Sequence, residues 1–183
     1  MKKNFVFILI LIVIDQFTKL LIWHNYINVD AELLSGIIFF RPVQNTHFTW
    51  MFNILDYKSP ILLMIIIQIF ALVIVSLSYR YLSYLWIKGQ RFLNGMLIFF
   101  VAVIICSFVD VVFWGGSLDF IRLFDWFTFD FKDVYSKIGT AFLLFYAADY
   151  YIKSYFKMNK KERKQTNILT WIKKGMPSSL PIE

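Results

Sequence analysis

Long apolar segments dominate this chain and restrict the folds that it can adopt. A helix needs about 20 mostly apolar residues to cross a bilayer, and segments 5–23, 60–79 and 92–114 meet that requirement. The whole chain is 59% hydrophobic and 20% aromatic, with a mean hydropathy of +0.62. These values exceed the apolar content of an ordinary soluble domain. We therefore predict an all-α integral membrane protein.

A fourth segment, 134–152, is a weaker candidate for a span. Its polar residues lie near its ends, where they can reach the membrane interface; they are Tyr135, Ser136, Lys137 and Asp149. Four spans would also place every loop consistently with its charge. We therefore predict four transmembrane helices in residues 1–153, followed by a basic tail, 154–183. We expect this tail to be solvated or partly disordered, with a short amphipathic piece around 168–172.

The distribution of charged residues predicts the orientation. Basic residues are concentrated before the first span, between the second and third spans, and after residue 152. By the positive-inside rule these segments, and so both termini, are cytoplasmic. The remaining two loops face outward and hold most of the acidic residues: Asp30, Glu32, Asp56, Asp119, Asp125, Asp130 and Asp133.

The net charge of +7 does not require a nucleic-acid partner. Topology explains most of it, and the basic stretch 157–164 can lie against anionic lipid headgroups. The single cysteine, Cys106, falls inside the third span, so the chain can form neither an internal disulfide nor a thiolate metal cluster. We expect membrane lipids as partners, no nucleic acid, and no metal or cofactor.

Two acidic residues, Asp110 and Asp133, are predicted to lie at the outer membrane boundary. Asp110 lies four residues before the end of the third span, about 6 Å deep at the usual helical rise. Negative charge is disfavoured near a helix C-terminus, so Asp110 needs a further explanation. Asp133 opens the fourth span, where the helix dipole favours an acid. An ionisable residue at such a depth is a functional candidate.

A pair of aspartates that share one proton would explain both positions. One carboxyl then stays protonated while the other is ionised. Such a pair supplies a general acid and a general base, and it can hydrolyse an amide without a metal or a covalent nucleophile. We therefore predict an intramembrane aspartic protease whose catalytic residues are Asp110 and Asp133.

Other polar residues accompany this pair. Asp15 and Lys19 are four residues apart on the first span and share a helix face, so they can form an ion pair. The sequence leaves open whether that pair is only structural or belongs to the site. Ser107 precedes Asp110 by three residues and points the same way.

Five short segments also occur in the order and spacing of known motifs. Residues 15–19 read Asp-Gln-Phe-Thr-Lys, residues 118–121 read Leu-Asp-Phe-Ile, and residues 129–133 read Phe-Asp-Phe-Lys-Asp. Together with Asn45 and the stretch 107–110, they resemble motifs of the lipoprotein signal peptidases, or signal peptidase II. Those motifs are Asp-Gln-x-Thr-Lys, Asn-x-Gly, Gly-Asn-x-x-Asp-Arg, Val-Asp-Phe-Ile and Phe-Asn-x-Ala-Asp. The resemblance covers roughly residues 5–152.

The resemblance implies a reaction and a location. Members of this family remove signal peptides from prolipoproteins in the bacterial cytoplasmic membrane, cutting before a cysteine that carries diacylglyceryl. The resemblance implies that Asp110 and Asp133 are the catalytic aspartates and that they lie at the extracytoplasmic face. It also implies a small extracytoplasmic sheet within residues 26–57, with strands near 37–40 and 48–52. The remaining site residues would bind substrate or shape the pocket: Asp15, Lys19, Asn45, Ser107, Asp119 and Asp130.

Several motif positions depart from the family pattern. The substituted positions are Cys106 and Ser107 for Gly-Asn, Val111 for arginine, His47 for glycine, and Asp130 and Lys132 for asparagine and alanine. A second interpretation is therefore a signal-peptidase-like membrane protein that binds lipoproteins or signal peptides without cutting them. A third is a small transporter whose carboxylates relay protons, but clustering of the acids at one interface disfavours it.

Overall fold

Apolar helices form the frame of the molecule. The computed structural model describes residues 2–46, 60–124 and 126–178. In it α1 spans Lys2–Asn25, α3 spans Ile61–Leu85 and α4 spans Gln90–Val109, preceded by a short 3-10 turn, η1 (Ile87–Gly89). Three stretches, Lys3–Asn25, Ile61–Leu85 and Ile87–Trp114, are long and apolar enough to cross a membrane. These helices are consistent with the prediction of a membrane protein, and they lie where the apolar segments predicted spans.

A fourth long helix, α5, spans Phe131–Lys153. Its 23 residues give it a length of about 34 Å. Lys132, Asp133, Lys137 and Asp149 reduce its apolar character, so only three helices in the described part of the chain reach the hydropathy of a span. The fourth crossing, and the orientation that depends on it, stay predictions.

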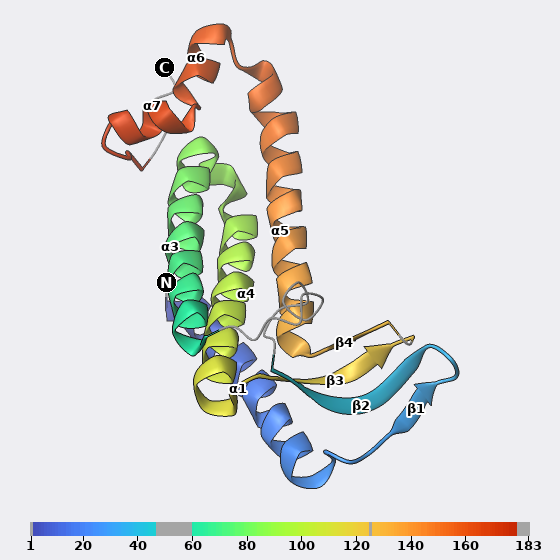
Figure 1. Cartoon of the computed structure of the whole chain (residues 1–183). Helices are drawn as coiled ribbons and strands as arrows, with labels where there is room; N and C mark the ends of the chain where they lie inside the picture. Colours follow the sequence, from blue (N-terminus) through green and yellow to red (C-terminus); the bar gives the residue numbers. More distant parts are fainter. Residues whose placement is uncertain (1, 47–59, 125, 179–183) are drawn as a thin grey trace.

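The other three long helices, α1, α3 and α5, are arranged around α4. α4 packs against α1, α3 and α5, and Figure 1 shows α3 and α5 on either side of it. Two glycines allow α4 and α5 to approach each other closely. A Cβ atom on Gly95 would lie 2.6 Å from the ring of Phe142, and one on Gly139 would lie 3.0 Å from the ring of Phe100.

Gly95→Val should therefore force α4 and α5 apart. Overpacking of this kind costs about 1–3 kcal/mol, so the free energy of unfolding should fall by that amount, measured by denaturation in detergent. Ala148→Val is the matched control, because it adds a similar side chain at an exposed position of α5. Equal stability of the two variants would contradict the close contact between the helices.

A small antiparallel sheet lies at one end of the helices (Figure 1). It contains β1 (Ala31–Leu34), β2 (Ile38–Asn45), β3 (Ser117–Leu123) and β4 (Phe127–Phe129), in that order. β2 and β3 pair so that Val43 lies opposite Asp119 and Asn45 lies opposite Ser117. This register brings the two loops that the charge pattern assigned to one face into a single sheet.

The sheet corrects part of the sequence prediction. The strand expected at 37–40 forms as the first part of β2, whereas the strand expected at 48–52 lies outside the described residues. The sheet is also not confined to residues 26–57, since β3 and β4 come from the loop that precedes α5. The physical reason is burial: Leu118 and Phe120 pack with Ile22 at the end of α1, so β3 gains an apolar support there.

The C-terminal segment folds back onto the opposite end of the molecule. It contains a turn, η3 (Tyr155–Lys157), and two short helices, α6 (Lys160–Gln165) and α7 (Ile168–Lys173). Trp171 is only 2% exposed and packs in a cluster that includes Tyr84 of α3 and Tyr150 of α5. The Tyr84 hydroxyl donates a 3.0 Å hydrogen bond to the carbonyl of Gln165.

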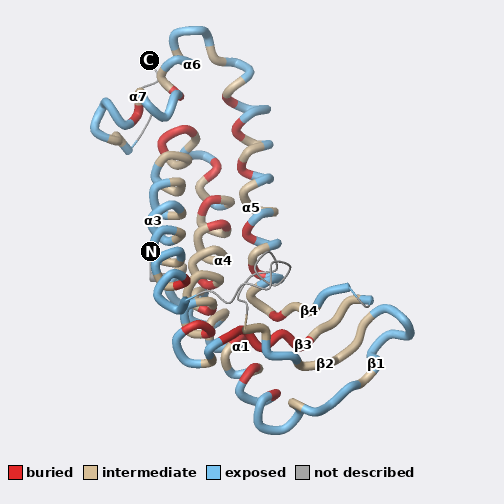
Figure 2. Tube along the Cα trace, viewed as in Figure 1, coloured by how far each residue is buried: buried red, intermediate tan, exposed pale blue. Residues whose placement is uncertain are grey.

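This docking differs from the solvated tail that the sequence suggested. Most residues of α6 and α7 are exposed, but Thr166 and Trp171 are buried where the segment contacts the helices (Figure 2). The amphipathic piece expected at 168–172 does form, as α7. The buried indole of Trp171 supplies the apolar area that holds this segment against α3 and α5.

Candidate active site

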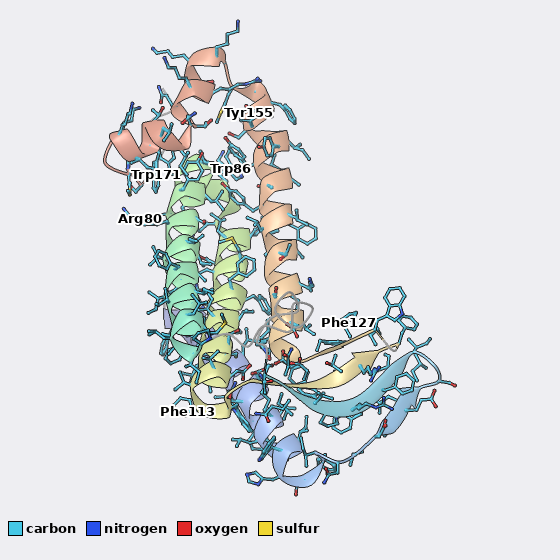
Figure 3. All side chains as sticks on the ribbon, viewed as in Figure 1. Arg80, Trp86, Phe113, Phe127, Tyr155 and Trp171 are labelled. Carbon is cyan, nitrogen blue, oxygen red and sulfur yellow. The ribbon has the colours of Figure 1, made fainter. Side chains whose placement is uncertain are left out.

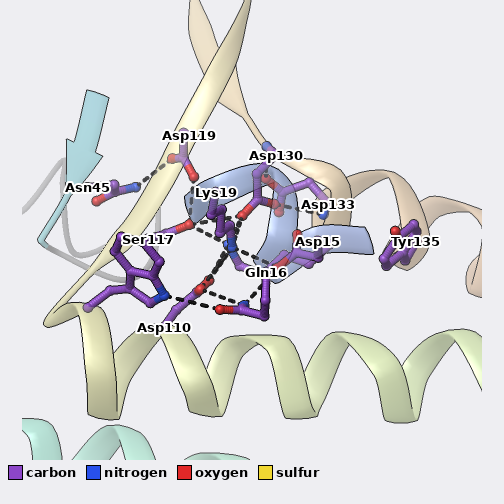
Figure 4. A network of polar contacts seen from close by, with 12 residues as sticks. Asp15, Gln16, Lys19, Asn45, Asp110, Ser117, Asp119, Asp130, Asp133 and Tyr135 are labelled. Carbon is purple, nitrogen blue, oxygen red and sulfur yellow. Dashed lines mark hydrogen bonds and ion pairs between the residues drawn. The ribbon is translucent and has the colours of Figure 1, made fainter. Parts of the chain in front are cut away.

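A completely buried ammonium group lies at the centre of the polar network. Lys19 of α1 is 0% exposed, and its Nζ lies 3.0 Å from Asp15, 2.8 Å from Asp110 and 2.7 Å from Asp130 (Figure 4). Burial of an unpaired ammonium group is very costly, so these carboxylates are what allow Lys19 to lie there. The ion pair predicted between Asp15 and Lys19 is confirmed.

Asp110 is held by two lysines. Lys19 contacts both of its carboxylate oxygens at 2.8 Å, and Lys132 approaches to 3.0 Å. The Gln16 amide donates a further hydrogen bond of 3.2 Å. These cations offset the unfavourable position of an acid near a helix C-terminus. They explain why Asp110 is tolerated at this end of α4.

The backbone around Asp110 departs from a regular α-helix. The five residues Asp110–Trp114 form a π-helical turn, η2, which ends at Gly115 in a left-handed conformation with φ of 63°. Single π turns occur frequently at functional sites. Gly116 follows, where a Cβ would lie 2.7 Å from the carbonyl oxygen of Asn45, so this close approach between the turn and β2 requires glycine.

Asp130 caps the N-terminus of α5. Its carboxylate accepts a hydrogen bond from the Asp133 backbone N–H, and the Asp133 carboxylate accepts one from the Asp130 backbone N–H, both at 3.2 Å. This reciprocal arrangement is a capping box. Burial alone would raise the pKa of Asp130, but the ammonium groups of Lys132 and Lys19 hold it below its usual value.

Asp119 reaches the same region from β3. It is 5% exposed, and it accepts hydrogen bonds from the Ser117 hydroxyl at 2.7 Å and from the Asn45 amide at 3.3 Å. Burial raises the pKa of Asp119, although Lys132 opposes the shift. Asp119 is therefore a carboxyl that tends to retain its proton.

Three carboxyl groups converge at the start of α5. One oxygen each from Asp119, Asp130 and Asp133 lies within 4.8 Å of the others. Asp133 is exposed as a residue, but its carboxyl turns back toward the Asp130 N–H. Loss of water around that carboxyl, together with the negative charge of Asp130, raises the pKa of Asp133 to about 6.

The charge balance of the network favours a retained proton. Five carboxyl groups belong to it, and only two ammonium groups, Lys19 and Lys132, neutralise them within the described residues. Because crowded carboxylates cannot all ionise, at least one should hold a proton at neutral pH. The three converging carboxyls could also ligate a cation, but Lys132 already places a positive charge against Asp130 there. The expectation of no metal stays a prediction.

The structure brings most of the predicted site residues together. Asp15, Lys19, Asn45, Asp119 and Asp130 all belong to the network, as Figure 4 shows. Asp110 and Asp133 belong to different parts of it: the carboxyl groups that cluster with Asp133 are those of Asp119 and Asp130. Ser107 is half-buried on α4, and its side chain makes no hydrogen bond to the network in the part of the chain that the structure describes.

Sequence reasoning missed four participants. Ser117 donates to Asp119 and Asp130, and Lys132 contacts Asp110 and Asp130. Gln16 links Asp110 to the indole N–H of Trp114, which donates a 3.1 Å hydrogen bond to the Gln16 amide oxygen. Lys132 lies between two acids in the sequence, and that pattern could have predicted its place in the network. The role of Ser117 depends on the course of the β3 backbone, so no sequence pattern could have predicted it.

A cavity of about 880 Å³ opens beside Asp133. One part of its wall is polar and the other is aromatic, with Asn45, Asp133 and Lys137 among the polar residues and Trp126, Phe127 and Phe129 among the aromatic ones. Its volume falls within the usual range for ligand sites, roughly 300–1,000 Å³. Through Asp133, the carboxyl cluster therefore borders a space that can hold a substrate segment.

Comparisons with known proteins agree with this arrangement. The sequence model of the family described as signal peptidase (SPase) II matches residues 7–149. Two solved structures, both described as bacterial membrane enzymes determined by the in meso method at 1.9 and 2.3 Å, are 19% identical to this chain with TM-scores of 0.63. The first covers 79% of this chain and 92% of its own, and the second covers 87% and 94%. At this identity the likeness concerns the fold. No curated protein matches the chain.

Proposed function

Since the chain belongs to the signal peptidase II family, we propose that it is an intramembrane aspartic endopeptidase that removes signal peptides from prolipoproteins. The bond cut would be the one before a cysteine that carries a diacylglyceryl group. The observation that carries the proposal is the cluster of Asp119, Asp130 and Asp133 beside a large, partly aromatic cavity.

The geometry favours Asp119 and Asp133 as the reacting pair. Both carboxyls have a raised pKa, and one oxygen of each lies within 4.8 Å of the other at the start of α5. Asp130 is held ionised by two lysines, and Asp110 is tied to the same two cations. Our proposal therefore replaces the predicted pair of Asp110 and Asp133 with Asp119 and Asp133, and assigns Asp110 a positioning role through Lys19 and Lys132.

The chemistry requires one proton shared between the two carboxyls. The ionised member removes a proton from a water molecule, which attacks the scissile carbonyl carbon, while the protonated member donates to the carbonyl oxygen. When the C–N bond breaks, the leaving nitrogen takes up a proton from the pair. The aromatic part of the cavity wall, with Trp126 and Phe127, offers apolar contact to the substrate.

The membrane placement forms part of the proposal. With four crossings and both termini in the cytoplasm, the sheet and the carboxyl cluster lie at the extracytoplasmic face of a bacterial cytoplasmic membrane. The basic segments would then lie on the cytoplasmic side, in agreement with the positive-inside rule. Residues 1–153 form the peptidase-like unit in this proposal, and residues 154–183 follow it on the cytoplasmic side.

The direct test is cleavage by the purified full chain. A prolipoprotein modified with diacylglyceryl should lose its signal peptide, and the same prolipoprotein without the lipid should not. Release would be followed by mass spectrometry of both fragments. Tight binding without cleavage of several modified prolipoproteins would instead support the interpretation of a protein that binds but does not cut.

The shared proton predicts a bell-shaped dependence of kcat/KM on pH. The general acid must be protonated, so the rate should fall as rising pH removes the shared proton; the raised pKa of Asp133, about 6, places this arm at pH 6 or above. The rate should also fall at low pH, when the second carboxyl is protonated. A profile from about pH 4 to about pH 9 tests both arms. A rate that rises throughout this range would contradict the shared proton.

A further inference from the structure

An apolar groove lies at the end of the molecule opposite the sheet, away from the carboxyl network. It has a volume of about 500 Å³. Its walls come from four helices, with α7 across its end, and include Ser78 and Tyr81 of α3, Phe100 of α4, Leu143 of α5, and Trp171 and Ile172 of α7.

The groove opens beside a helix surface that is suited to lipid. Apart from Met64, Tyr84 and Leu85, the side chains of α3 are at least partly exposed, and Ile74 and Leu77, which line the groove, are 60% and 41% exposed. α3 is also one of the helices that can cross a membrane. With α3 across the bilayer, hydrocarbon tails would surround the entrance to the groove.

Positive charge is concentrated where α7 closes the groove. Arg80 is exposed next to the lining residue Tyr81 (Figure 3), and its guanidinium donates a 3.5 Å hydrogen bond to the carbonyl of Met176. Lys173 and Lys174 directly follow the lining residue Ile172 and are also exposed. Neither α3 nor α7 contains an acidic residue, so nothing on the two helices neutralises these cations.

The geometry points to a binding site for one anionic phospholipid. An acyl chain would occupy the groove between α3 and α5, and the phosphate of the headgroup would lie near Arg80, Lys173 and Lys174. An apolar channel with cations at one end is complementary to a molecule with an apolar tail and one anionic head. A signal helix lacks the concentrated negative charge that this end of the groove favours.

Titration of the purified full chain with defined lipids, followed by native mass spectrometry, tests the site. Phosphatidylglycerol should bind at least about tenfold more tightly than phosphatidylcholine with the same acyl chains. The variant Lys173→Gln/Lys174→Gln should lose most of that preference. The matched control, Lys3→Gln/Lys88→Gln, removes the same charge from exposed positions of α1 and η1 that do not line the groove, and should keep the preference.

A second variant tests the groove itself. Ser78→Phe places a ring in the space that an acyl chain would fill, and it should weaken the binding of both lipids while the melting temperature stays unchanged. Equal affinity for the two lipids, an equal loss of preference in the Lys3→Gln/Lys88→Gln control, or unchanged binding in Ser78→Phe would each overturn the proposal. Displacement of phosphatidylglycerol by a synthetic signal peptide, with no preference between lipids, would assign the groove to the substrate helix instead.

Discussion

Asp119→Asn and Asp133→Asn are each expected to reduce cleavage of a lipid-modified prolipoprotein by more than about a hundredfold. Asparagine has nearly the same shape as aspartate but can neither accept the proton of water nor hold the shared proton. Each variant removes one of the two groups that the reaction needs. The measurement is the rate of signal-peptide release at saturating substrate, with thermal unfolding in detergent to show that the variant is folded.

Two further substitutions separate catalysis from general disturbance of the site. Asp30→Asn removes an exposed acid that pairs with Arg41 at the edge of the sheet, and it should leave the rate unchanged. Asp110→Asn removes one of the carboxylates that neutralise Lys19 and Lys132, so its main effect should be on stability. A folded Asp110→Asn protein with no activity, beside an active Asp119→Asn protein, would restore the pair that the sequence predicted.

The sequence alone predicted the long helices and most of the polar network. The apolar segments predicted α1, α3 and α4 because a membrane-spanning helix must bury its backbone polar groups within one continuous run. The residue types also identified most members of the polar network, since acids and a lysine in or beside apolar helices are too costly to lie there without partners. Both inferences depend on local sequence alone.

The parts that were missed depend on contacts between distant segments. β2 pairs with β3 across more than 70 positions of the chain, as the contact between Asn45 and Asp119 shows. No local pattern specified that Lys19 would also contact Asp130, or that Lys132 would turn toward Asp110. Our proposal of Asp119, in place of Asp110, as the partner of Asp133 therefore rests on the fold.

Lys19→Met is expected to lower the free energy of unfolding by about 3–5 kcal/mol, the usual cost when one partner of a buried ion pair is removed. The substitution keeps the length of the apolar stem but leaves Asp15, Asp110 and Asp130 without their common cation. Lys3→Met is the control on the same helix, because Lys3 is exposed and its loss should change stability little. Denaturation in detergent measures both.

Asp15 should account for much of that loss. Lys132 still neutralises Asp110 and Asp130 when Lys19 is absent, whereas the Oδ2 atom of Asp15 would keep only its hydrogen bond from Gln16. Its Oδ1 atom already has no hydrogen-bond partner among the described residues. The double variant Lys19→Met/Asp15→Asn removes the stranded charge, so it should be more stable than Lys19→Met alone. A double variant that is less stable would show that Asp15 does not depend on Lys19 for its neutralisation.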